Sequence, residues 1–240
     1  MAPLQINVTG TGSTLRPAER AILVLQAYSP ELSSAADASA TVTLTANTIR
    51  EAINPHCPQD EATRQTKPGA AIAHYSMSTL DTNSRSRAID KTKEKYETVY
   101  TASAQFNIKF ADFDVLNALA TDFSAMQNVK IQKIEWHLTD AKMASIEGEA
   151  RKRAASDAIQ RAHDYAEMFA EVAVEDLGKR VKAVSVKENN YYQRSTRPQL
   201  HVGKMQRYEG IRTHGKEELQ FQPEDVRLSV SVDGTFVVEV

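Results

Sequence analysis

The sequence predicts an α+β protein with a mixed, mostly antiparallel β-sheet on which long helices pack. Three segments lead to this fold class. Polar and apolar residues alternate at the two ends of the chain, over residues 4–9 and 225–240, and an unbroken helical period runs over residues 140–172. The elements between them show no internal repeat and no second core. We therefore expect residues 1–240 to form a single α+β domain.

The first two expected elements are strands. Apolar and polar residues alternate from Leu4 to Thr9, and this strand should end at a turn made by Gly10 and Gly12. The run AILVL within residues 18–28 is typical of a strand that is buried on both faces. The glycine pair also matches part of a phosphate-binding loop. Because no third glycine or lysine follows and the next element is a strand, a plain turn is favoured.

A helix is expected from Ser29 to Asn54. Ser29 suits an N-cap and Pro30 suits the first helical position. The helix ends before Pro55, because a residue that precedes proline avoids the α region. Residues 40–48 are rich in β-branched side chains and would also suit a strand. The helix is favoured because apolar residues keep a spacing of three or four through the segment.

The middle of the chain is expected to hold a hairpin, a short helix and a strand. Strands over residues 70–81 and 96–110 are joined by a charged connection, and even-numbered residues carry the apolar face of the second strand. Asp112 begins a helix that ends near Asn128. In the strand over residues 129–138 the apolar set changes face midway, which predicts a β-bulge or a contact on both faces of the strand.

The longest expected helix, residues 140–172, has a face made mainly of alanine. Steps of three or four place on this face Ile146, Ala150, Ala154, Ala158, Ala162, Tyr165, Phe169 and Val172. Such a face lets the helix lie close to a sheet, and Gly178 should provide the C-terminal cap. Acid–base pairs four residues apart indicate a solvated opposite face: Glu147 with Arg151, and Asp157 with Arg161.

The chain is expected to end in a strand over residues 181–187, a loop and a last strand. Asp233 and Gly234 together resemble a tight hairpin turn. However, the apolar pattern keeps to even-numbered positions on both sides of this pair: Val226, Leu228, Val230, Val232, Phe236, Val238 and Val240. A two-residue turn would break this parity. One continuous strand, bent or bulged at the glycine, is therefore favoured.

Composition bears on the partners and the compartment. A formal net charge of -2 gives no overall field that would attract nucleic acid or an anionic membrane. The single Cys57 excludes an internal disulfide and a cysteine-built metal site, and no adjacent lysine or arginine activates its thiol for redox sensing. With no signal peptide and no apolar run of about 20 residues, we expect a cytoplasmic or nucleocytoplasmic protein without membrane contact.

No catalytic site, metal site or cofactor-binding motif is visible in the sequence. The six histidines lack metal-ligand spacing, and no motif for a nucleophile occurs. His74 and His137 lie on expected strands and could meet in space, which leaves open an enzyme or carrier with a polar pocket around them. A half-buried, hydrogen-bonded histidine is the more common outcome. We therefore expect a protein that is not an enzyme and has no cofactor.

Residues 188–222 are expected to form a mobile basic insertion, because they are polar and show no sustained period. Over residues 187–222, seven Lys or Arg against four Glu leave a local charge of 7 - 4 = +3. Basic residues interleaved with tyrosines would suit an acidic ligand or single-stranded nucleic acid, although a solvated loop is the simpler interpretation. The candidate contact residues are Tyr191, Tyr192, Arg194, Arg197, Lys204, Arg207, Tyr208 and Arg212.

Three segments, in order, resemble the SIMPL family, which is named after a signalling molecule that associates with a mouse pelle-like kinase. They are INVTGTGSTLRPAERAILVLQAYS, EARKRAASDAIQRAHDYAEMFAEVAVEDLGKRVKAVSVKE and FQPEDVRLSVSVDGTFVVEV. Residues 57–95 and 188–222 depart from the family pattern. The resemblance implies a SIMPL-like fold and no agreed catalytic residues. Relatives include bacterial envelope proteins linked to oxidative-stress defence, one of them a ring-like oligomer, and a mammalian protein that binds a receptor-associated kinase.

The leading hypothesis is a non-enzymatic protein-interaction or assembly module of the SIMPL type, acting in a stress or signalling response. Its long apolar C-terminal strand suits pairing between subunits, so we expect a homo-oligomer formed through the terminal strands. The resemblance alone adds a kinase-type protein partner. The alternative is binding of nucleic acid or an acidic ligand through residues 188–222, in which nucleic acid is the less favoured partner.

Overall fold

A computed structural model describes residues 3–61, 63, 65–88, 96–189 and 220–239. It confirms the predicted α+β class, with helices packed on antiparallel sheets. The described residues form two compact units. Of the described residues, unit 1 contains 3–18, 138–189 and 224–239, and unit 2 contains those between 19 and 137 together with 220–223. The expectation of one mixed sheet was wrong, because each unit has its own sheet and every described strand pair is antiparallel.

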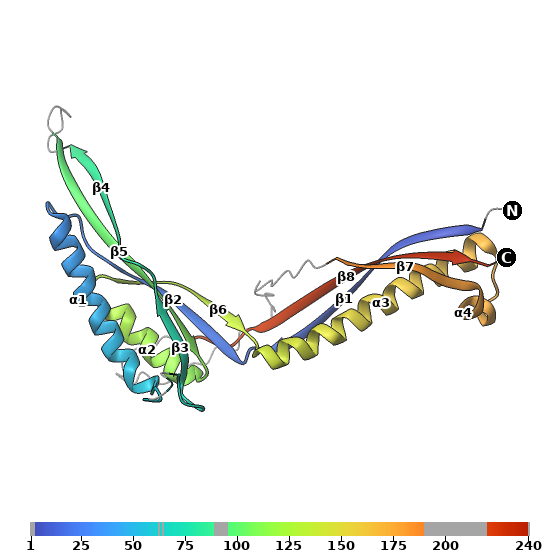
Figure 1. The fold of residues 1–240 in the computed structure, drawn as a ribbon, viewed down its shortest axis with the longest axis horizontal. Coiled ribbons are helices and arrows are strands. Elements are labelled where there is room, and N and C mark those ends of the chain that lie inside the picture. Colours follow the sequence, from blue (N-terminus) through green and yellow to red (C-terminus); the bar gives the residue numbers. More distant parts are fainter. Residues whose placement is uncertain (1–2, 62, 64, 89–95, 190–219, 240) are drawn as a thin grey trace, which may run out of the picture. The chain divides into compact units, whose positions relative to one another are not determined.

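Unit 1 is a three-stranded sheet under one long helix, with strand order β1-β8-β7. Its elements are β1 (Leu4–Pro17), α3 (Asp140–Ala170), the 3-10 turn η2 (Val174–Asp176), α4 (Leu177–Arg180), β7 (Val181–Asn189) and β8 (Asp225–Val238). Helix α3 runs along β1 and β8 (Figure 1). The chain's first and last strands are therefore neighbours in one sheet.

The last strand is continuous, as its parity predicts. β8 pairs with β1 without a register break, from Val238 opposite Leu4 to Asp225 opposite Pro17. Its even-numbered residues are all buried from Val226 to Val238. A Cβ at Gly234 would lie 2.6 Å from the Phe236 ring, so the glycine keeps the strand straight past a bulky side chain and does not form a turn.

The turn expected at Gly10 and Gly12 was wrong, because β1 runs through both glycines. A Cβ at Gly10 would lie 2.1 Å from the Ala154 carbonyl oxygen, and one at Gly12 would lie 2.2 Å from that of Ala150. Glycine is needed here because the strand backbone lies directly against the helix backbone. Sequence alone shows the two glycines but not the helix that approaches them.

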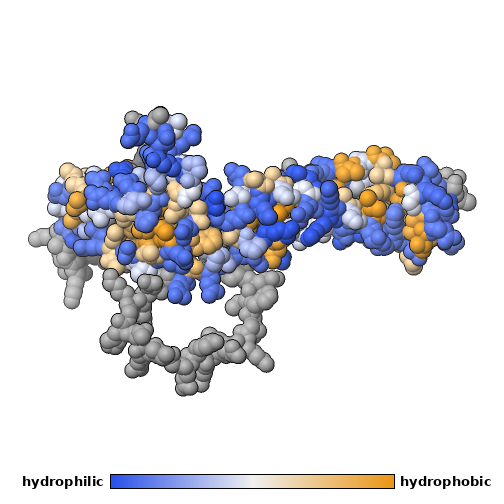
Figure 2. Space-filling view, turned by 90° about the horizontal axis from the view of Figure 1, so that it is seen from below, coloured by the Kyte–Doolittle hydropathy of each residue, from blue (hydrophilic) through white to orange (hydrophobic). Residues whose placement is uncertain are grey.

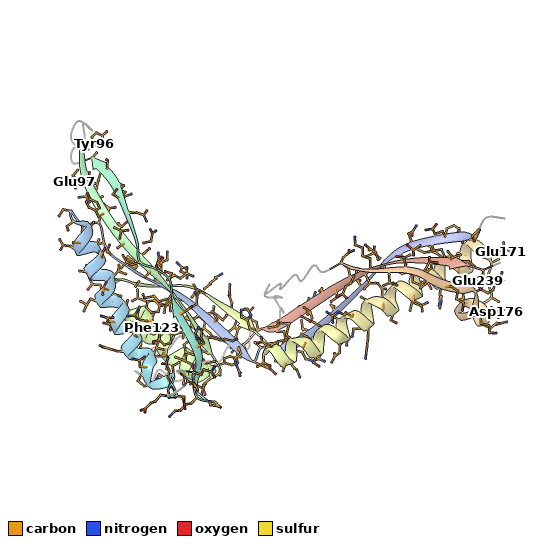
Figure 3. The ribbon with its side chains drawn as sticks, viewed as in Figure 1. Tyr96, Glu97, Phe123, Glu171, Asp176 and Glu239 are labelled. Carbon is orange, nitrogen blue, oxygen red and sulfur yellow. The ribbon has the colours of Figure 1, made fainter. Side chains whose placement is uncertain are left out.

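The alanine face of α3 is buried as predicted, but the C-terminal end of this face differs from the prediction. The buried residues hold a strict step of four: Ile146, Ala150, Ala154, Ala158, Ala162 and Ala166. Tyr165 and Phe169, which were placed on this face, are exposed instead. The helix also stops before Gly178. Glu171, labelled in Figure 3, takes the left-handed conformation at φ 51° and ends α3.

Unit 2 has the strand order β3-β5-β2-β6, with β4 pairing on β5. Its elements are β2 (Arg20–Tyr28), α1 (Ala35–Ile53), the 3-10 turn η1 (Asn54–His56), β3 (Ile72–Met77), β4 (Asp81–Ala88), β5 (Tyr96–Phe110), α2 (Phe113–Ala125) and β6 (Val129–His137). Without β4 this is the split β-α-β-β-α-β arrangement. Phe123 of α2, labelled in Figure 3, is fully buried in this unit.

Two local predictions in unit 2 were wrong. Ser29 does not cap α1, because its buried hydroxyl accepts the backbone N–H of Ala102 on β5, and Ser34 takes the N-cap position. The charged connection after residue 81 is not all loop, because β4 extends the hairpin with β5. Arg85 and Arg87 of β4 bond to Glu31, which anchors this exposed strand. Tyr96 and Glu97 lie at the start of β5 (Figure 3).

Other local predictions are confirmed. Asp112 caps α2, and the pairing of β6 with β2 shifts register between Val24 and Leu25. The β-branched middle of α1 is helical, and its threonine hydroxyls donate to backbone carbonyls four residues earlier. They belong to Thr41, Thr43, Thr45 and Thr48. Such local bonds let threonine sit in a helix despite its restricted side chain.

Candidate functional site

Two outward backbone groups in the second half of β1 are bonded to side chains of α3. The backbone N–H of Thr11 donates to Asp157 Oδ2 at 2.8 Å, and Arg153 Nη1 donates to the Ser13 carbonyl at 2.7 Å. Further along, Arg16 forms an ion pair with Glu149 at 2.8 Å. The three helix residues are four apart, so they lie on one flank of α3 beside β1.

These contacts cover an edge that would otherwise be free. β1 is a terminal strand of its sheet, and such strands present unpaired N–H and C=O groups to any other extended chain. The Thr11 N–H and then the Arg161 guanidinium hold the pKa of Asp157 below its ordinary value of 3.8, because both favour the carboxylate. A charged acceptor thus occupies this part of the edge at neutral pH.

The N-terminal half of the same edge is open. Since the Thr11 N–H and the Ser13 carbonyl point away from β8, strand alternation also points the backbone of Gln5, Asn7 and Thr9 outward. Within the described part of the chain, no group bonds to these outward N–H and C=O groups. The covered and open halves of β1 therefore meet between Thr9 and Thr11.

Exposed apolar side chains lie on the flank of α3 beside the open half. Steps of four from Asp157 lead to Arg161, Tyr165 and Phe169. Four helix residues advance about 6 Å and two strand residues about 6.6 Å, so Tyr165 lies level with Asn7. This alignment is consistent with the cluster that joins Ile6 to Ala162 and Ala166.

Tyr165, Met168 and Phe169, here called the apolar trio, are 48%, 75% and 74% exposed. The rings of Tyr165 and Phe169 are 6.1 Å apart between centroids. In Figure 2, hydrophobic residues reach the surface of unit 1 toward the end where α3 stops. The open backbone edge and an exposed apolar surface thus occur side by side. That combination can bind an extended chain through backbone hydrogen bonds and apolar contacts.

The other two strands of unit 1 are less suited to pairing with an added strand. β8 is bonded on both sides, so the predicted pairing of subunits through the C-terminal strand has no free edge there, and the edge strands of this sheet are β1 and β7. The outer strand β7 has a register shift between Ala183 and Ser185 and carries Lys182 and Lys187. Bulges and lysines both discourage strand addition.

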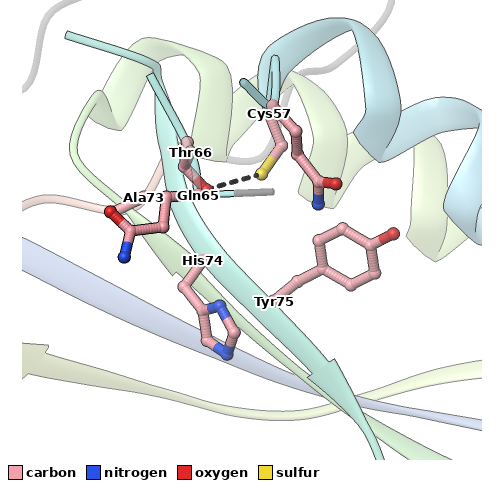
Figure 4. Close-up of a pocket in the computed structure, with 7 residues that line it drawn as sticks. Cys57, Gln65, Thr66, Ala73, His74 and Tyr75 are labelled. Carbon is pink, nitrogen blue, oxygen red and sulfur yellow. Dashed lines mark hydrogen bonds between the residues drawn. The ribbon is translucent and has the colours of Figure 1, made fainter. Parts of the chain in front are cut away.

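A shallow pocket in unit 2 contains the single cysteine (Figure 4). Cys57 is buried, and its Sγ lies 3.5 Å from Thr66 Oγ1. Tyr75 and His74 follow one another on β3, so their side chains leave opposite faces of the sheet. Among the described residues that line the pocket there is no lysine or arginine to stabilise a thiolate. The structure thus provides no support for a reactive Cys57.

The two strand histidines are not brought together. His74 is on β3 and His137 on β6, and strands β5 and β2 separate them by about 14 Å at the usual strand spacing. His137 lies 3.6 Å from Glu135, whose pKa is lowered first by a hydrogen bond from Lys133. Among the described residues, no group of three His, Cys, Asp or Glu side chains could hold a metal ion.

The basic loop predicted as a contact surface lies outside the described residues. This applies to all its candidate residues: Tyr191, Tyr192, Arg194, Arg197, Lys204, Arg207, Tyr208 and Arg212. The loop hypothesis stays a prediction from the sequence. Sequence analysis missed the half-open edge of β1. The signal that could have revealed it is the step of four that changes along α3 from charged residues to Tyr165 and Phe169.

These features define a class of α+β protein in which the first and last strands pair beneath one alanine-faced helix. Residues 6–236 match the sequence model of the SIMPL family, described as a protein of unknown function (DUF541), so the chain belongs to that family. A search of curated proteins finds no match. Within the described residues, none of the helices is both long enough and apolar enough to cross a membrane.

Proposed function

We propose that the protein is a non-enzymatic interaction and assembly module that associates by strand addition to the open half of β1. The observation that carries the proposal is the contrast within one strand edge. The Thr11 N–H and the Ser13 carbonyl are bonded to α3, whereas Gln5, Asn7 and Thr9 present outward backbone groups without a described partner beside an apolar surface. Free edges of this kind are normally blocked in proteins, and an unblocked one marks a pairing site.

The two parts of the site supply different contributions. Backbone N–H and C=O groups recognise any extended chain, while side-chain contacts determine which chain binds. Leu4 and Val8 are only partly buried beneath α3, and an added strand would cover them together with the apolar trio. Burying such side chains stabilises an interface by roughly 25 cal/mol per Å² of apolar surface.

The proposal is tested by the mass of the protein in solution. Size-exclusion chromatography with light scattering should show an assembly at tens of micromolar. The double variant Tyr165→Lys/Phe169→Lys should shift the population toward monomer, because charges would replace the apolar surface. A strict monomer in the native chain at these concentrations would overturn self-association.

Ile159→Lys is the matched control. Ile159 is also on α3 and 45% exposed, but it lies eight residues beyond Arg151, which bonds to Glu188 of β7. It therefore faces the β7 side of the helix, away from the open edge. Its substitution should leave the assembly unchanged. Equal loss of assembly in both variants would show that the interface is not at β1.

Binding of an acidic ligand or nucleic acid through residues 188–222 is the second candidate, motivated by the local charge of +3 over residues 187–222. It requires an affinity that falls steeply with salt and that is lost when the segment is deleted. Binding that survives the deletion would remove this candidate. A kinase-type partner and a stress or signalling role remain expectations from family resemblance.

A further inference from the structure

We infer that the chain bound at the open edge is β1 of a second copy, antiparallel and centred on Asn7, so that two copies form one continuous sheet. The inference rests on the proposed assembly function and adds the partner, the strand and the register. The strand order across the pair would be β7-β8-β1 followed by the partner's β1-β8-β7. Such a contact is self-complementary and closes as a two-fold dimer.

The directions of the backbone N–H and C=O groups of β1 determine the register of the pair. In an antiparallel pair, residues that point N–H and C=O at the partner lie opposite one another. The open positions are Gln5, Asn7 and Thr9. Centring the axis on Asn7 pairs Gln5 with Thr9 and Asn7 with itself, so every open position is used. An axis centred on Ile6 or Val8 would place one of these three residues opposite a residue that has no free backbone N–H to complete the pair.

Two features limit the paired segment. In this register the next outward position on one copy is Thr11, which lies opposite Pro3 of the other. The Thr11 N–H is already donated to Asp157, and Pro3 has no N–H to donate. Pairing therefore stops at both ends of the segment, and no backbone N–H at these two positions is left without an acceptor. The open segment and its two stops are symmetric about Asn7.

The helices satisfy the same symmetry. A two-fold axis perpendicular to the sheet keeps both α3 helices on one face, and Tyr165 lies level with Asn7. The apolar trio of each copy would therefore approach the trio of the other. The charged flank formed by Glu149, Arg153 and Asp157 lies away from the axis, where it bonds to its own β1. Arg161 lies one step of four before Tyr165, between this flank and the apolar trio, and forms an ion pair with Asp157 of its own helix.

Disulfide trapping tests the register. In a Cys57→Ala background, Asn7→Cys should give a covalent dimer under mild oxidation. Directly opposed residues of this type have Cα atoms about 5.5 Å apart, within the range of about 4.4–6.8 Å that a disulfide spans. Thr11→Cys is the control, because the two Thr11 positions would be eight strand residues, or roughly 26 Å, apart.

A mixed experiment tests the direction of the strands. Gln5→Cys and Thr9→Cys should each fail to form a covalent dimer alone and should cross-link when mixed. An assembly seen by light scattering whose Asn7→Cys chains stay uncross-linked, or whose Gln5→Cys chains cross-link to one another, would overturn the register while leaving the assembly function intact. A monomer in the same light-scattering experiment would overturn both.

A second pair of variants keeps the test independent of oxidation. Asn7→Pro removes the outward N–H, which bonds to no described group, and proline is tolerated at such edge positions. It should leave the circular dichroism spectrum unchanged and abolish the dimer. Asn7→Ala keeps the N–H but loses the side-chain bond to Thr235 Oγ1. Its dimer should persist, and loss of the dimer in Asn7→Ala would show that the side chain, and not the backbone edge, makes the contact.

Discussion

The backbone N–H of Thr11 donates to Oδ2 of Asp157 at 2.8 Å, so a helix carboxylate takes the place that a neighbouring strand would occupy. The same oxygen accepts from Arg161 at 3.1 Å, which orients the carboxylate from its own helix. One aspartate therefore marks the boundary between the covered and open halves of β1. Its charge state determines whether that cover is strong.

The Asp157 contact should make stability depend on pH. Its pKa is lowered in the folded state, so its contribution is complete above the unfolded-state pKa and is lost as pH falls through the folded value. The stability difference between the native chain and Asp157→Ala should be constant near neutral pH and should shrink below about pH 4, the ordinary range of the carboxyl. Urea unfolding at a series of pH values measures this difference.

Asp164→Ala is the control for that series. Asp164 is exposed on the same helix, and among the described residues it accepts a hydrogen bond only from Gln160. Its removal should change stability little, as is usual for an exposed surface residue. If the effect of Asp157→Ala kept its full size well below pH 3, the contribution would not come from the charge.

Replacing a strand glycine should be costly. Gly10→Ala would place a Cβ 2.1 Å from the Ala154 carbonyl oxygen, a backbone atom that cannot move aside alone. We expect a loss of at least about 1–3 kcal/mol, the usual cost of overpacking a close contact. Gly148→Ala is the matched control, because nothing lies within 4 Å of that Cβ, and it should stabilise α3 by roughly 0.5–1 kcal/mol. Similar unfolding free energies for both variants would refute the close approach of β1 to α3.

Enlarging the alanine face should separate α3 from the sheet. Ala154→Leu adds volume at a fully buried position and should cost about 1–3 kcal/mol. Ala144→Leu makes the same change at an exposed position of the helix and should be nearly neutral. Thermal unfolding compares the two. A neutral Ala154→Leu would mean that this face of the helix meets solvent.

Removing the Ser29 hydroxyl should expose its structural role. Ser29→Ala leaves the buried N–H of Ala102 without its side-chain acceptor at 2.8 Å, which should cost about 1–3 kcal/mol. Ser124→Ala removes an exposed hydroxyl that donates to Thr121 and should have a small effect. Equal effects in chemical denaturation would argue against a buried bond between β2 and β5.

Patterns internal to one element were predictable from the sequence. The even-numbered apolar residues of β8 identified a single strand because strand side chains alternate strictly. The alanines of α3 identified its buried face because a helix repeats nearly every four residues. Asp112 identified the start of α2 for a similar reason, since a cap bonds only to its own helix.

Features that depend on a distant partner were not predictable. Ser29 suits a helix cap locally, and only the approach of Ala102 gives it a different bond. The charges of β4 indicate a loop until β5 and Glu31 are placed beside them. The half-open edge could not be predicted because it depends on three features that come from different segments. They are the pairing of β1 with β8, the outward direction of the Thr11 backbone, and the position of α3.

The pairing of β1 with β8 also orders events during synthesis. The described helices and strands of unit 2 lie between residues 20 and 137, so the ribosome releases them as one contiguous block. β1 emerges first, yet its partner begins only at Asp225. The strands of unit 2 can therefore pair before β8 is made, whereas the sheet of unit 1 closes through contacts more than 200 residues apart, a type of pairing that forms slowly. During that interval the N-terminal strand has no partner strand, and a nascent chain that stops before Asp225 leaves its whole length unpaired.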